Sequence, residues 1–331
     1  MSTEALIQAT ALNRYYGNHH VVNDFNLTLR KGEVLGLLGP NGAGKSSTMQ
    51  MITGNIAPSS GEVIIKGCNL LEDPQQAKRS IGYLPEQPPV YRDMTSREFL
   101  SYCAALHDIN KSDRKKFIGL AIERCGLQSM QDRLIGNLSK GYQQRVGIAQ
   151  AILHQPDVII LDEPTVGLDP IQIKQIRELI LELGKDHSVI LSTHILPEVQ
   201  AVCDRVQIIN HGKTVFSDSF KQLANRQNAS MVLVGFDQGG DREALQKLAG
   251  IERVEELERV ANQTKFLLRY GPSENSASLE NNAVTQTRSS DIFQLAIDKG
   301  WKLNELTPQT ETLEQIFMNL VHGETQVPEH E

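Results

Sequence analysis

Residues Gly39 to Ser46 read Gly-Pro-Asn-Gly-Ala-Gly-Lys-Ser, which fits the spacing G-x-x-x-x-G-K-[ST]. They follow the apolar run Val34–Leu38 and lead into Ser46–Ile52, which reads as a helix. Glycines at this spacing let the backbone curl so that successive N–H groups point into one concavity, and a helix start adds partial positive charge there. The lysine supplies a full charge, and the hydroxyl after it is placed to ligate a cation. The sequence therefore predicts a phosphate-binding loop between a strand and a helix.

Two acidic residues close another apolar run, Val158–Leu161, which is followed directly by Asp162 and Glu163. This pattern describes a buried strand whose tip presents carboxylates at the ligand edge of a parallel sheet, although alone it also fits an ordinary strand end. After a phosphate-binding loop, we interpret Asp162 as a ligand of Mg²⁺ together with Ser46. We interpret Glu163 as the group that orients or deprotonates an attacking water, a task that contributes about 10²–10⁴-fold in rate.

A third motif, Leu138–Arg145, precedes that strand and reads Leu-Ser-Lys-Gly-Tyr-Gln-Gln-Arg. Ser139 fits the N-cap of a helix over Tyr142–Leu153, whose N-terminus forms a second anion site, separate from the loop. In isolation, the same residues also fit a plain helix cap without a ligand.

The order of these motifs makes residues 5–225 resemble the ATP-binding subunit of ABC transporters. That order is phosphate loop, Leu-Ser-x-Gly, apolar-Asp-Glu, Gly167-Leu168-Asp169 and Ser192-Thr193-His194. The resemblance implies a head-to-tail dimer of two copies of the chain. Each ATP, with its Mg²⁺, would lie between the phosphate loop of one copy and the signature helix of the other.

The resemblance also assigns roles to individual residues. It makes Glu163 the catalytic carboxylate, His194 the switch residue that contacts the γ-phosphate and the water, and Lys45 the cation on the phosphates. Asp169 would couple the two sites, and Tyr16 would stack on adenine. The nucleotide-contacting residues that it implies are Tyr16, Gly39, Pro40, Asn41, Gly42, Ala43, Gly44, Lys45, Ser46, Ser47, Ser139, Gly141 and Asp169.

Two stretches depart from the usual pattern of the family. Lys140 and Tyr142 stand where the signature usually has glycine and glutamine. The essential serine and second glycine remain, so we expect the activity to survive. At the position of a glutamine that reaches the metal, the chain offers Glu86 and then Gln87, and either side chain could reach Mg²⁺.

The elements around the motifs predict an α/β protein of the P-loop NTPase class. Strands alternate with helices, which indicates a mixed, largely parallel central sheet with an antiparallel β edge. Helical spacing at Ser96–Leu106 and Ser112–Cys125 indicates a helical subdomain over about residues 92–155.

The charge distribution indicates a second domain. Residues 226–331 contain 17 Asp and Glu but 10 Lys and Arg, so this region carries the whole net charge of −7. A length of 331 residues also suggests two domains. We expect the ATP-binding domain at 5–225, a smaller α+β accessory domain at 226–323 and a disordered tail at 324–331.

The patterns of the accessory domain follow a β-α-β-β-α-β order, which is ferredoxin-like. Its predicted helices include Asp241–Leu248, Ser290–Lys299 and Thr312–Val321. The polar stretch Gly271–Arg288 is expected to be a mobile loop.

Composition and charge narrow the compartment and the partners. An acidic chain lacks the basic surface that broad nucleic-acid binding needs. There is no run of 18 apolar residues, no export signal is visible, and the four cysteines are scattered. We expect a cytoplasmic protein that joins the cytoplasmic face of the cell membrane peripherally, through a permease.

Leu84–Tyr91, the lysine-containing signature and Leu313–Phe317 resemble the ABC-2 export branch, with the multidrug-type and gliding-motility-associated ATPases nearest. That resemblance implies a separate ABC-2 membrane permease as partner. Two alternatives remain, an importer ATPase and a non-transport ABC ATPase that acts on ribosomes or DNA. Importers tend to end in small all-β domains, and the non-transport class usually has two nucleotide domains or long coiled coils, so export is favoured.

Overall fold

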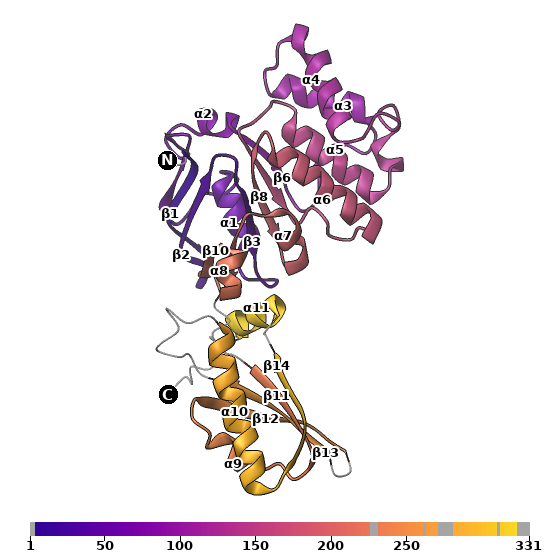
Figure 1. The fold of residues 1–331 in the computed structure, drawn as a ribbon. Coiled ribbons are helices and arrows are strands. Elements are labelled where there is room, and N and C mark those ends of the chain that lie inside the picture. Colours follow the sequence, from indigo (N-terminus) through magenta and orange to yellow (C-terminus); the bar gives the residue numbers. More distant parts are fainter. Residues whose placement is uncertain (1–3, 226–230, 261–262, 271–280, 310–311, 323–331) are drawn as a thin grey trace. The chain divides into compact units, whose positions relative to one another are not determined.

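The computed structural model describes residues 4–225, 231–260, 263–270, 281–309 and 312–322 (Figure 1). The chain divides into two compact units, Met1–Phe220 and Lys221–Glu331. The division falls slightly before residue 226, where the charge distribution changes. A short helix that the sequence did not predict, α8 (Phe220–Asn225), spans the difference. The two units are described separately below.

Six strands of residues 4–220 form the central sheet of the first unit, in the order β10-β9-β3-β8-β7-β6. Five are parallel, and β10 pairs antiparallel with β9 at the edge. The strands are β3 (Val34–Leu38), β6 (Ile81–Leu84), β7 (Val158–Asp162), β8 (Ser188–Thr193), β9 (Arg205–Asn210) and β10 (Lys213–Ser219). Because β3, β8 and β7 are parallel neighbours, the segments that follow them meet at one edge of the sheet.

A second sheet of this unit is antiparallel, with the order β2-β1-β4-β5. Its strands are β1 (Ala5–Tyr16), β2 (His19–Arg30), β4 (Ser60–Ile65) and β5 (Cys68–Asn69). The hairpin between β1 and β2 turns at Gly17, which has φ of +59°. This conformation suits glycine because it has no Cβ, and it permits the tight turn between the two strands.

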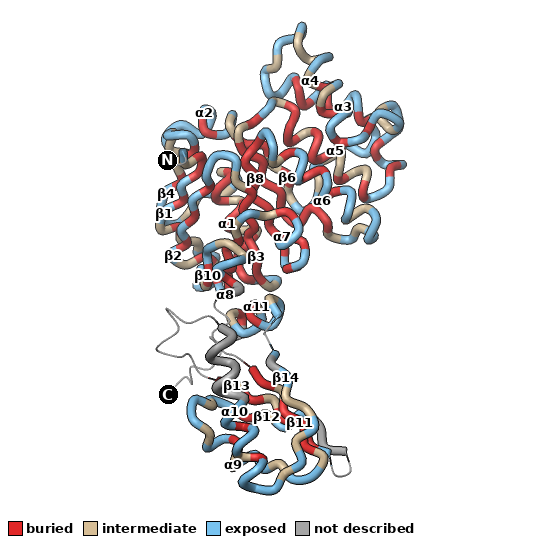
Figure 2. The backbone as a smooth tube through the Cα atoms, viewed as in Figure 1, coloured by how far each residue is buried: buried red, intermediate tan, exposed pale blue. Residues whose placement is uncertain are grey.

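Helices cover the central sheet on both sides, and two apolar cores result (Figure 2). One core joins the antiparallel sheet to α1 and the central sheet and includes Phe25, Leu35 and Met49. The other joins the sheet to the helical region and includes Phe99 and Ile148. The helices are α1 (Lys45–Ile52), α2 (Pro74–Arg79), α3 (Ser96–Leu106), α4 (Lys111–Arg124), η1 (Ile135–Asn137), α5 (Lys140–Ile152), α6 (Pro170–Gly184) and α7 (Leu196–Val202).

In the described part of the second unit, four strands form one antiparallel sheet in the order β12-β13-β11-β14. Its elements are β11 (Met231–Gln238), α9 (Arg242–Gln246), β12 (Ile251–Val260), β13 (Gln263–Tyr270), α10 (Asn281–Lys299), β14 (Lys302–Gln309) and α11 (Leu313–His322). The first strand of this unit, β11, thus lies between the third, β13, and the fourth, β14, as in the predicted ferredoxin-like arrangement. Phe236 packs edge-to-face on Phe266 and Trp301 in its core.

The prediction for Gly271–Arg288 was wrong in its second half, because α10 begins at Asn281 rather than at Ser290. Residues 281–290 are mostly Asn, Thr, Gln and Ser, which taken singly are not strong helix formers. They continue a helix whose later turns bury Ile292 and Ala296 in the core, so packing overrides local propensity. Residues 271–280 and the expected disordered tail lie outside the described residues.

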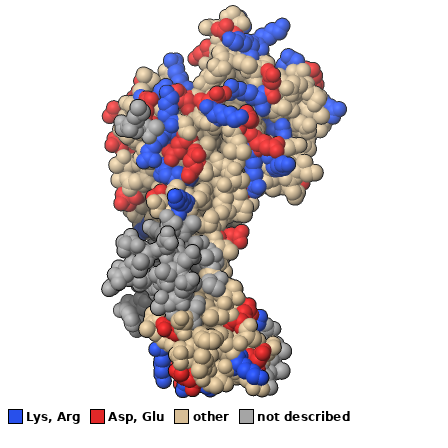
Figure 3. All heavy atoms as spheres, in the orientation of Figure 1, with Lys and Arg blue, Asp and Glu red and all other residues tan. Residues whose placement is uncertain are grey.

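Charged side chains of both signs are interspersed on the face shown in Figure 3. Among the residues that the structure describes, no helix is both long enough and apolar enough to span a bilayer.

Candidate nucleotide site

The loop between β3 and α1 has glycine where the backbone turns left-handed or touches its neighbours. Gly42 and Gly44 have φ of +80° and +102°. A Cβ on Gly39 would lie 2.3 Å from the carbonyl oxygen of Ile209, and one on Gly44 would lie 2.7 Å from that of Val21. Larger residues would force the backbone apart at both places. The loop therefore curls directly into the first turn of α1, where the helix dipole favours an anion.

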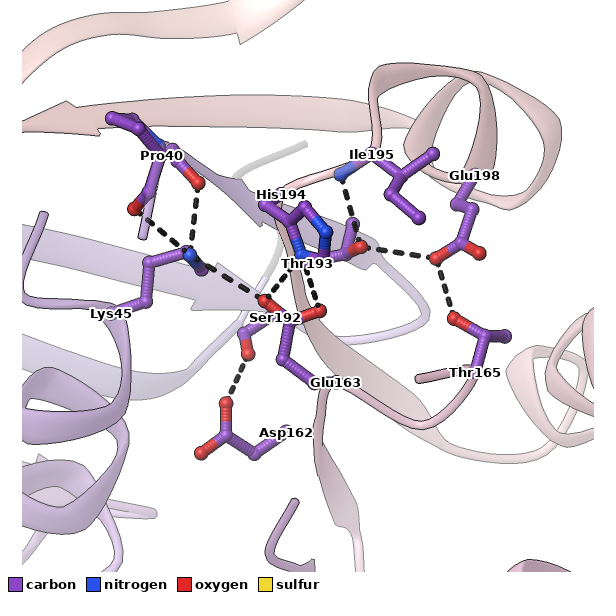
Figure 4. A network of polar contacts seen from close by, with 11 residues as sticks. Pro40, Lys45, Asp162, Glu163, Thr165, Ser192, Thr193, His194, Ile195 and Glu198 are labelled. Atoms are coloured by element: carbon purple, nitrogen blue, oxygen red, sulfur yellow. Dashed lines mark hydrogen bonds and ion pairs between the residues drawn. The ribbon is translucent and has the colours of Figure 1, made fainter. Parts of the chain in front are cut away.

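Lys45 is the first residue of α1, and it is only 6% exposed. Its Nζ donates to the carbonyl oxygens of Gly39 (2.8 Å) and Pro40 (3.2 Å) and lies 3.5 Å from Glu163 Oε1 (Figure 4). A buried ammonium requires such partners, because burial without them is costly. The cationic head of the lysine is thus held inside the loop that the sequence predicts to bind phosphates.

Asp162 is the last residue of β7, and it is buried beside other carboxylates. Burial is the main cause that raises its pKa, because it penalises the ionised form. Hydrogen bonds from Ser192 and Ser46 act in the opposite direction, whereas the negative charges of Glu163 and Glu86 add to the rise. The side chain therefore lies in contact with the Ser46 hydroxyl, as the assignment of both residues to one cation requires.

Three consecutive residues at the end of β8 each contact a different carboxylate. Ser192 Oγ donates to Asp162, Thr193 Oγ1 donates to Glu198 Oε2 over 3.0 Å, and His194 Nδ1 lies 3.0 Å from Glu163 Oε2. Figure 4 shows the three side chains and their acceptors. These three residues therefore hold the carboxylates of Asp162 at the end of β7, Glu163 directly after it and Glu198 on α7.

Glu163 has a backbone conformation that is uncommon for a residue with a side chain, with φ of +48°. Its N–H donates to the carbonyl oxygen of Ser192 over 3.0 Å, which secures this turn at the sheet edge. Such strain costs about 1–3 kcal/mol and occurs preferentially at functional sites. Here it leaves the carboxylate between Lys45 and His194.

A cavity of about 350 Å³ opens over these groups. It is lined by Val21, Asn41, Gly42, Gly44, Lys45, Ser46, Ser47, Glu86, Glu163, Val166 and His194. Of the two residues considered for the metal-reaching position, Glu86 lines the cavity, whereas Gln87 is exposed and does not. Tyr16 also lies outside the lining; it is 42% exposed, and the Arg14 guanidinium lies 4.7 Å from the centre of its ring.

The structure places Ser139, Gly141 and Asp169 at a second cavity, of about 520 Å³. None of its lining residues lines the first cavity: they are Ser139, Gly141, Tyr142, Arg145, Asp169, Pro170, Ile171, Gln172 and Gln175. Ser139 Oγ accepts from the N–H of Tyr142 (3.4 Å) and caps α5, while Asp169 Oδ1 accepts from that of Gln172 (2.9 Å) and caps α6. Two capped helices therefore begin at this cavity, and within one chain it is separate from the phosphate loop.

Comparison with known proteins identifies the family. The family described as ABC transporter matches residues 22–166. The bacitracin transport ATP-binding protein BcrA of Bacillus licheniformis is 33% identical over 327 residues, which cover 98% of this chain and 99% of that protein. The chain belongs to the family of ABC transporter ATP-binding proteins.

A further relative and a solved structure support the assignment of the chain to this family. The linearmycin resistance ATP-binding protein LnrL of Bacillus subtilis is 32% identical over 229 residues, with 69% of this chain and 74% of that protein covered. A solved structure of an ATP-binding subunit of an ABC transporter aligns with a TM-score of 0.61 and 30% identity, over 67% of this chain and 92% of the other. The protein is therefore an ATP-binding subunit of an ABC transporter and an ATP hydrolase, and its first unit has the P-loop NTPase fold.

The donors around the first cavity of the ABC ATPase fit a hard cation. The Ser46 hydroxyl and the carboxylates of Asp162 and Glu86 offer oxygen donors of the kind that such a cation binds. In the described residues, no group of three or more His, Cys, Asp or Glu side chains could hold a metal ion. Mg²⁺ characteristically takes one or two carboxylates and completes its octahedron with phosphate oxygens and water. The site thus suits a cation that arrives with its nucleotide.

Sequence reasoning missed four residues around this site: Val21, Thr165, Val166 and Glu198. Val21 and Val166 line the cavity, and the side chain of Glu198 joins Thr165 to Thr193. Val21 lies in an ordinary alternating strand pattern. An acid four residues after His194 looks like the polar face of a short helix, and only the fold shows that Glu198 is buried.

Proposed function

We propose that the protein binds MgATP between two copies of itself, arranged head to tail, and hydrolyses it to drive export through a separate ABC-2 membrane permease. The observation that carries the proposal is the grouping of Lys45, Glu163 and His194 at one cavity beside the glycine-rich loop. It combines a cation for phosphates with a carboxylate and an imidazole for a water. Phosphoryl transfer depends mostly on such positioning and electrostatic stabilisation.

The residues at and beside the first cavity would each have a separate role in ATP hydrolysis. Lys45 and the loop amides would bind the β- and γ-phosphates, and Ser46 with Asp162 would hold Mg²⁺, which neutralises charge on the phosphates. Glu163 would orient a water toward the γ-phosphorus and accept its proton. The new oxygen–phosphorus bond forms as the bond to ADP breaks, and His194 would steady the γ-phosphate and the water. Glu86, which lines the cavity, is the better placed residue for the outer metal shell.

The head-to-tail arrangement is supported by the separation of the two cavities. Lys45 and Ser139 line different cavities, so one chain alone does not bring its signature helix onto its own phosphate loop. In a dimer, Ser139 and Gly141 of one copy would cover the γ-phosphate held by Lys45 of the other, and Asp169 would link the two sites. A helix start capped by Ser139 still offers backbone N–H groups and a positive dipole end to that phosphate.

Tyr16 is proposed to stack on the adenine. One face of its ring is near the Arg14 guanidinium, and the residue is 42% exposed. A cation on one face and a base on the other would form a layered contact, in which stacking contributes about 1–3 kcal/mol.

The proposal of export through a permease is supported by the names of relatives, which concern bacitracin transport and linearmycin resistance. The permease would dock where residues 86–91 meet the helical region. The lining of a cavity of about 590 Å³ there includes Pro85 and Pro89 as well as His107, Gln150 and His154. A permease segment bound in this cavity would lie against Pro85. Pro85 directly precedes Glu86, which lines the nucleotide cavity, so a change at the nucleotide would be passed to the permease.

Mixing two defective variants tests the head-to-tail site. Lys45→Ala disables the phosphate loop, and Ser139→Arg blocks the second cavity. In a mixed dimer, both defects fall in one site, and the other site is intact. We expect neither variant alone to form a nucleotide-dependent dimer, and the mixture to form one by size-exclusion chromatography with light scattering. A mixture that stays monomeric with MgATP contradicts the shared site.

Co-purification tests the partner. When the protein is expressed with the membrane proteins of its own source, we expect it to retain a multi-span permease, and the MgATP-bound form to change that association. Recovery with ribosomes or with a periplasmic-binding-protein system would instead favour one of the alternative classes.

A further inference from the structure

Glu198, on α7, joins two segments that carry residues of the nucleotide cavity. Its Oε2 accepts hydrogen bonds from Thr165 Oγ1 over 2.7 Å and from Thr193 Oγ1 over 3.0 Å (Figure 4). Thr165 follows Glu163 by two residues, and Thr193 directly precedes His194. One carboxylate oxygen therefore connects the segment after β7 to the last residue of β8, beside the point where Glu163 and His194 meet.

The burial of this carboxylate needs an explanation. Glu198 is 2% exposed, and its second oxygen, Oε1, has no hydrogen-bond partner in the part of the chain that the structure describes. A buried carboxylate with an unpaired oxygen weakens a fold compared with an apolar side chain of similar size. Stability alone therefore does not account for an acid at this place.

The contacts of Glu198 suit a role in positioning. Thr193 Oγ1 also accepts from the N–H of Ile195 over 3.2 Å, so the hydroxyl that Glu198 holds fixes the turn that carries His194. On the other side, the link between Glu163 N and the carbonyl oxygen of Ser192 already secures the strand ends. The bridge through Glu198 adds a second attachment, between Thr165 and the last residue of β8.

We propose that Glu198 is a positioning residue of ATP hydrolysis, which holds Thr165 and Thr193 so that the Glu163 carboxylate and the His194 imidazole keep their separation. The inference rests on the roles proposed above for Glu163 and His194. Glu198 makes no contact with Lys45 or the phosphate loop in the described hydrogen bonds, so its loss changes kcat rather than nucleotide affinity. A displacement of about 1 Å in such a pair lowers the rate on the order of 10²-fold.

Two substitutions of Glu198 test the role on the purified full chain. In Glu198→Ala we expect kcat to fall by about 10- to 100-fold, while KM and the affinity for MgATP change by less than about threefold. Glu198→Gln keeps an oxygen that accepts from both threonines, and we expect it to restore kcat to within about threefold of the wild type. A residue that only supports the fold would lower activity in proportion to the folded fraction, which circular dichroism measures.

Matched threonine variants guard against a folding failure of Glu198→Ala. Thr165→Val and Thr193→Val each remove one donor to Glu198, and each is expected to lower kcat by about three- to tenfold. Thr53→Val is the control, because Thr53 Oγ1 donates to Met49 O over 2.9 Å, is buried, and touches neither Glu163 nor His194. We expect it to lower Tm like the other two while kcat is unchanged.

The outcomes separate this inference from the function on which it rests. Unchanged kcat in Thr165→Val and Thr193→Val overturns the inference, and so does a loss in Glu198→Ala that Glu198→Gln does not restore. Glu163→Gln is measured beside them. Full turnover in Glu163→Gln overturns both the catalytic role and the inference, whereas loss of turnover in Glu163→Gln together with normal turnover in Glu198→Ala overturns the inference alone.

Discussion

Lys45 Nζ lies 3.5 Å from Glu163 Oε1, and neither side chain is more than a tenth exposed. The group proposed to bind phosphate and the group proposed to activate water are thus partners inside the protein. A buried ion pair contributes little to stability compared with an apolar pair, but removal of one member leaves the other charge uncompensated. Substitutions at this pair therefore have two effects, one on ligand binding and one on the fold.

Lys45→Met separates those effects. We expect it to abolish measurable MgATP binding by calorimetry, because the phosphates lose their cation. It should also destabilise the fold by about 3 kcal/mol, because the buried Glu163 carboxylate loses its ammonium partner and keeps only the contact with His194. The double variant Lys45→Met with Glu163→Gln should recover most of that stability and none of the binding. Unchanged ATP affinity in the single variant would contradict the phosphate-loop assignment.

Glu163→Gln should keep nucleotide binding and lose turnover. The amide still fills the strained turn but accepts no proton from water, so we expect kcat to fall by about 10²–10⁴-fold. Dimers should then accumulate with ATP bound, which size-exclusion chromatography and analysis of the bound nucleotide detect. Glu178→Gln on α6 is exposed and serves as the control, with normal turnover expected. Normal turnover in Glu163→Gln would exclude its catalytic role.

The sequence predicts the parts of this site that depend on residues close together in the chain, and not the parts that depend on contacts between distant segments. The phosphate loop and the carboxylates after β7 are local patterns of strand end and turn, and the structure brings Lys45 and Glu163 to one cavity, as those patterns indicate. The predicted bounds of α3, Ser96–Leu106, match the structure as well. The unpredicted bridge through Glu198 depends on α7 packing beside two strand ends, and no local pattern records that proximity.

The choice between Glu86 and Gln87 shows the same limit. Both are polar and adjacent in sequence, and only the course of the backbone after β6 directs one of them to the cavity. Glu86 is the residue that lines the cavity, and its negative charge contributes to the raised pKa of Asp162.

Alanine substitutions at these two positions test that assignment. Glu86→Ala should raise the Mg²⁺ concentration for half-maximal ATPase activity by about threefold to tenfold, because the proposed outer metal shell loses one oxygen. Gln87→Ala should leave it unchanged, because Gln87 does not line the cavity. The measurement is ATPase rate against Mg²⁺ concentration at fixed ATP. A shift in Gln87→Ala without one in Glu86→Ala would reverse the assignment.

Asp162→Asn should stabilise the fold at neutral pH while it weakens the metal site. Burial raises the pKa of Asp162, so the folded protein holds this proton more tightly than the unfolded chain, and stability declines as pH rises through the raised value. Asparagine carries no charge and escapes that penalty. Without metal or nucleotide, we expect its Tm to exceed that of the wild type at pH 7, and the difference to shrink as pH falls toward the usual aspartate value near 4. Asp93→Asn, at an exposed position, should show no such trend, and the Asp162 variant should lose Mg²⁺-dependent turnover. A Tm difference that stays constant or widens at low pH would contradict the burial of this carboxylate as its cause.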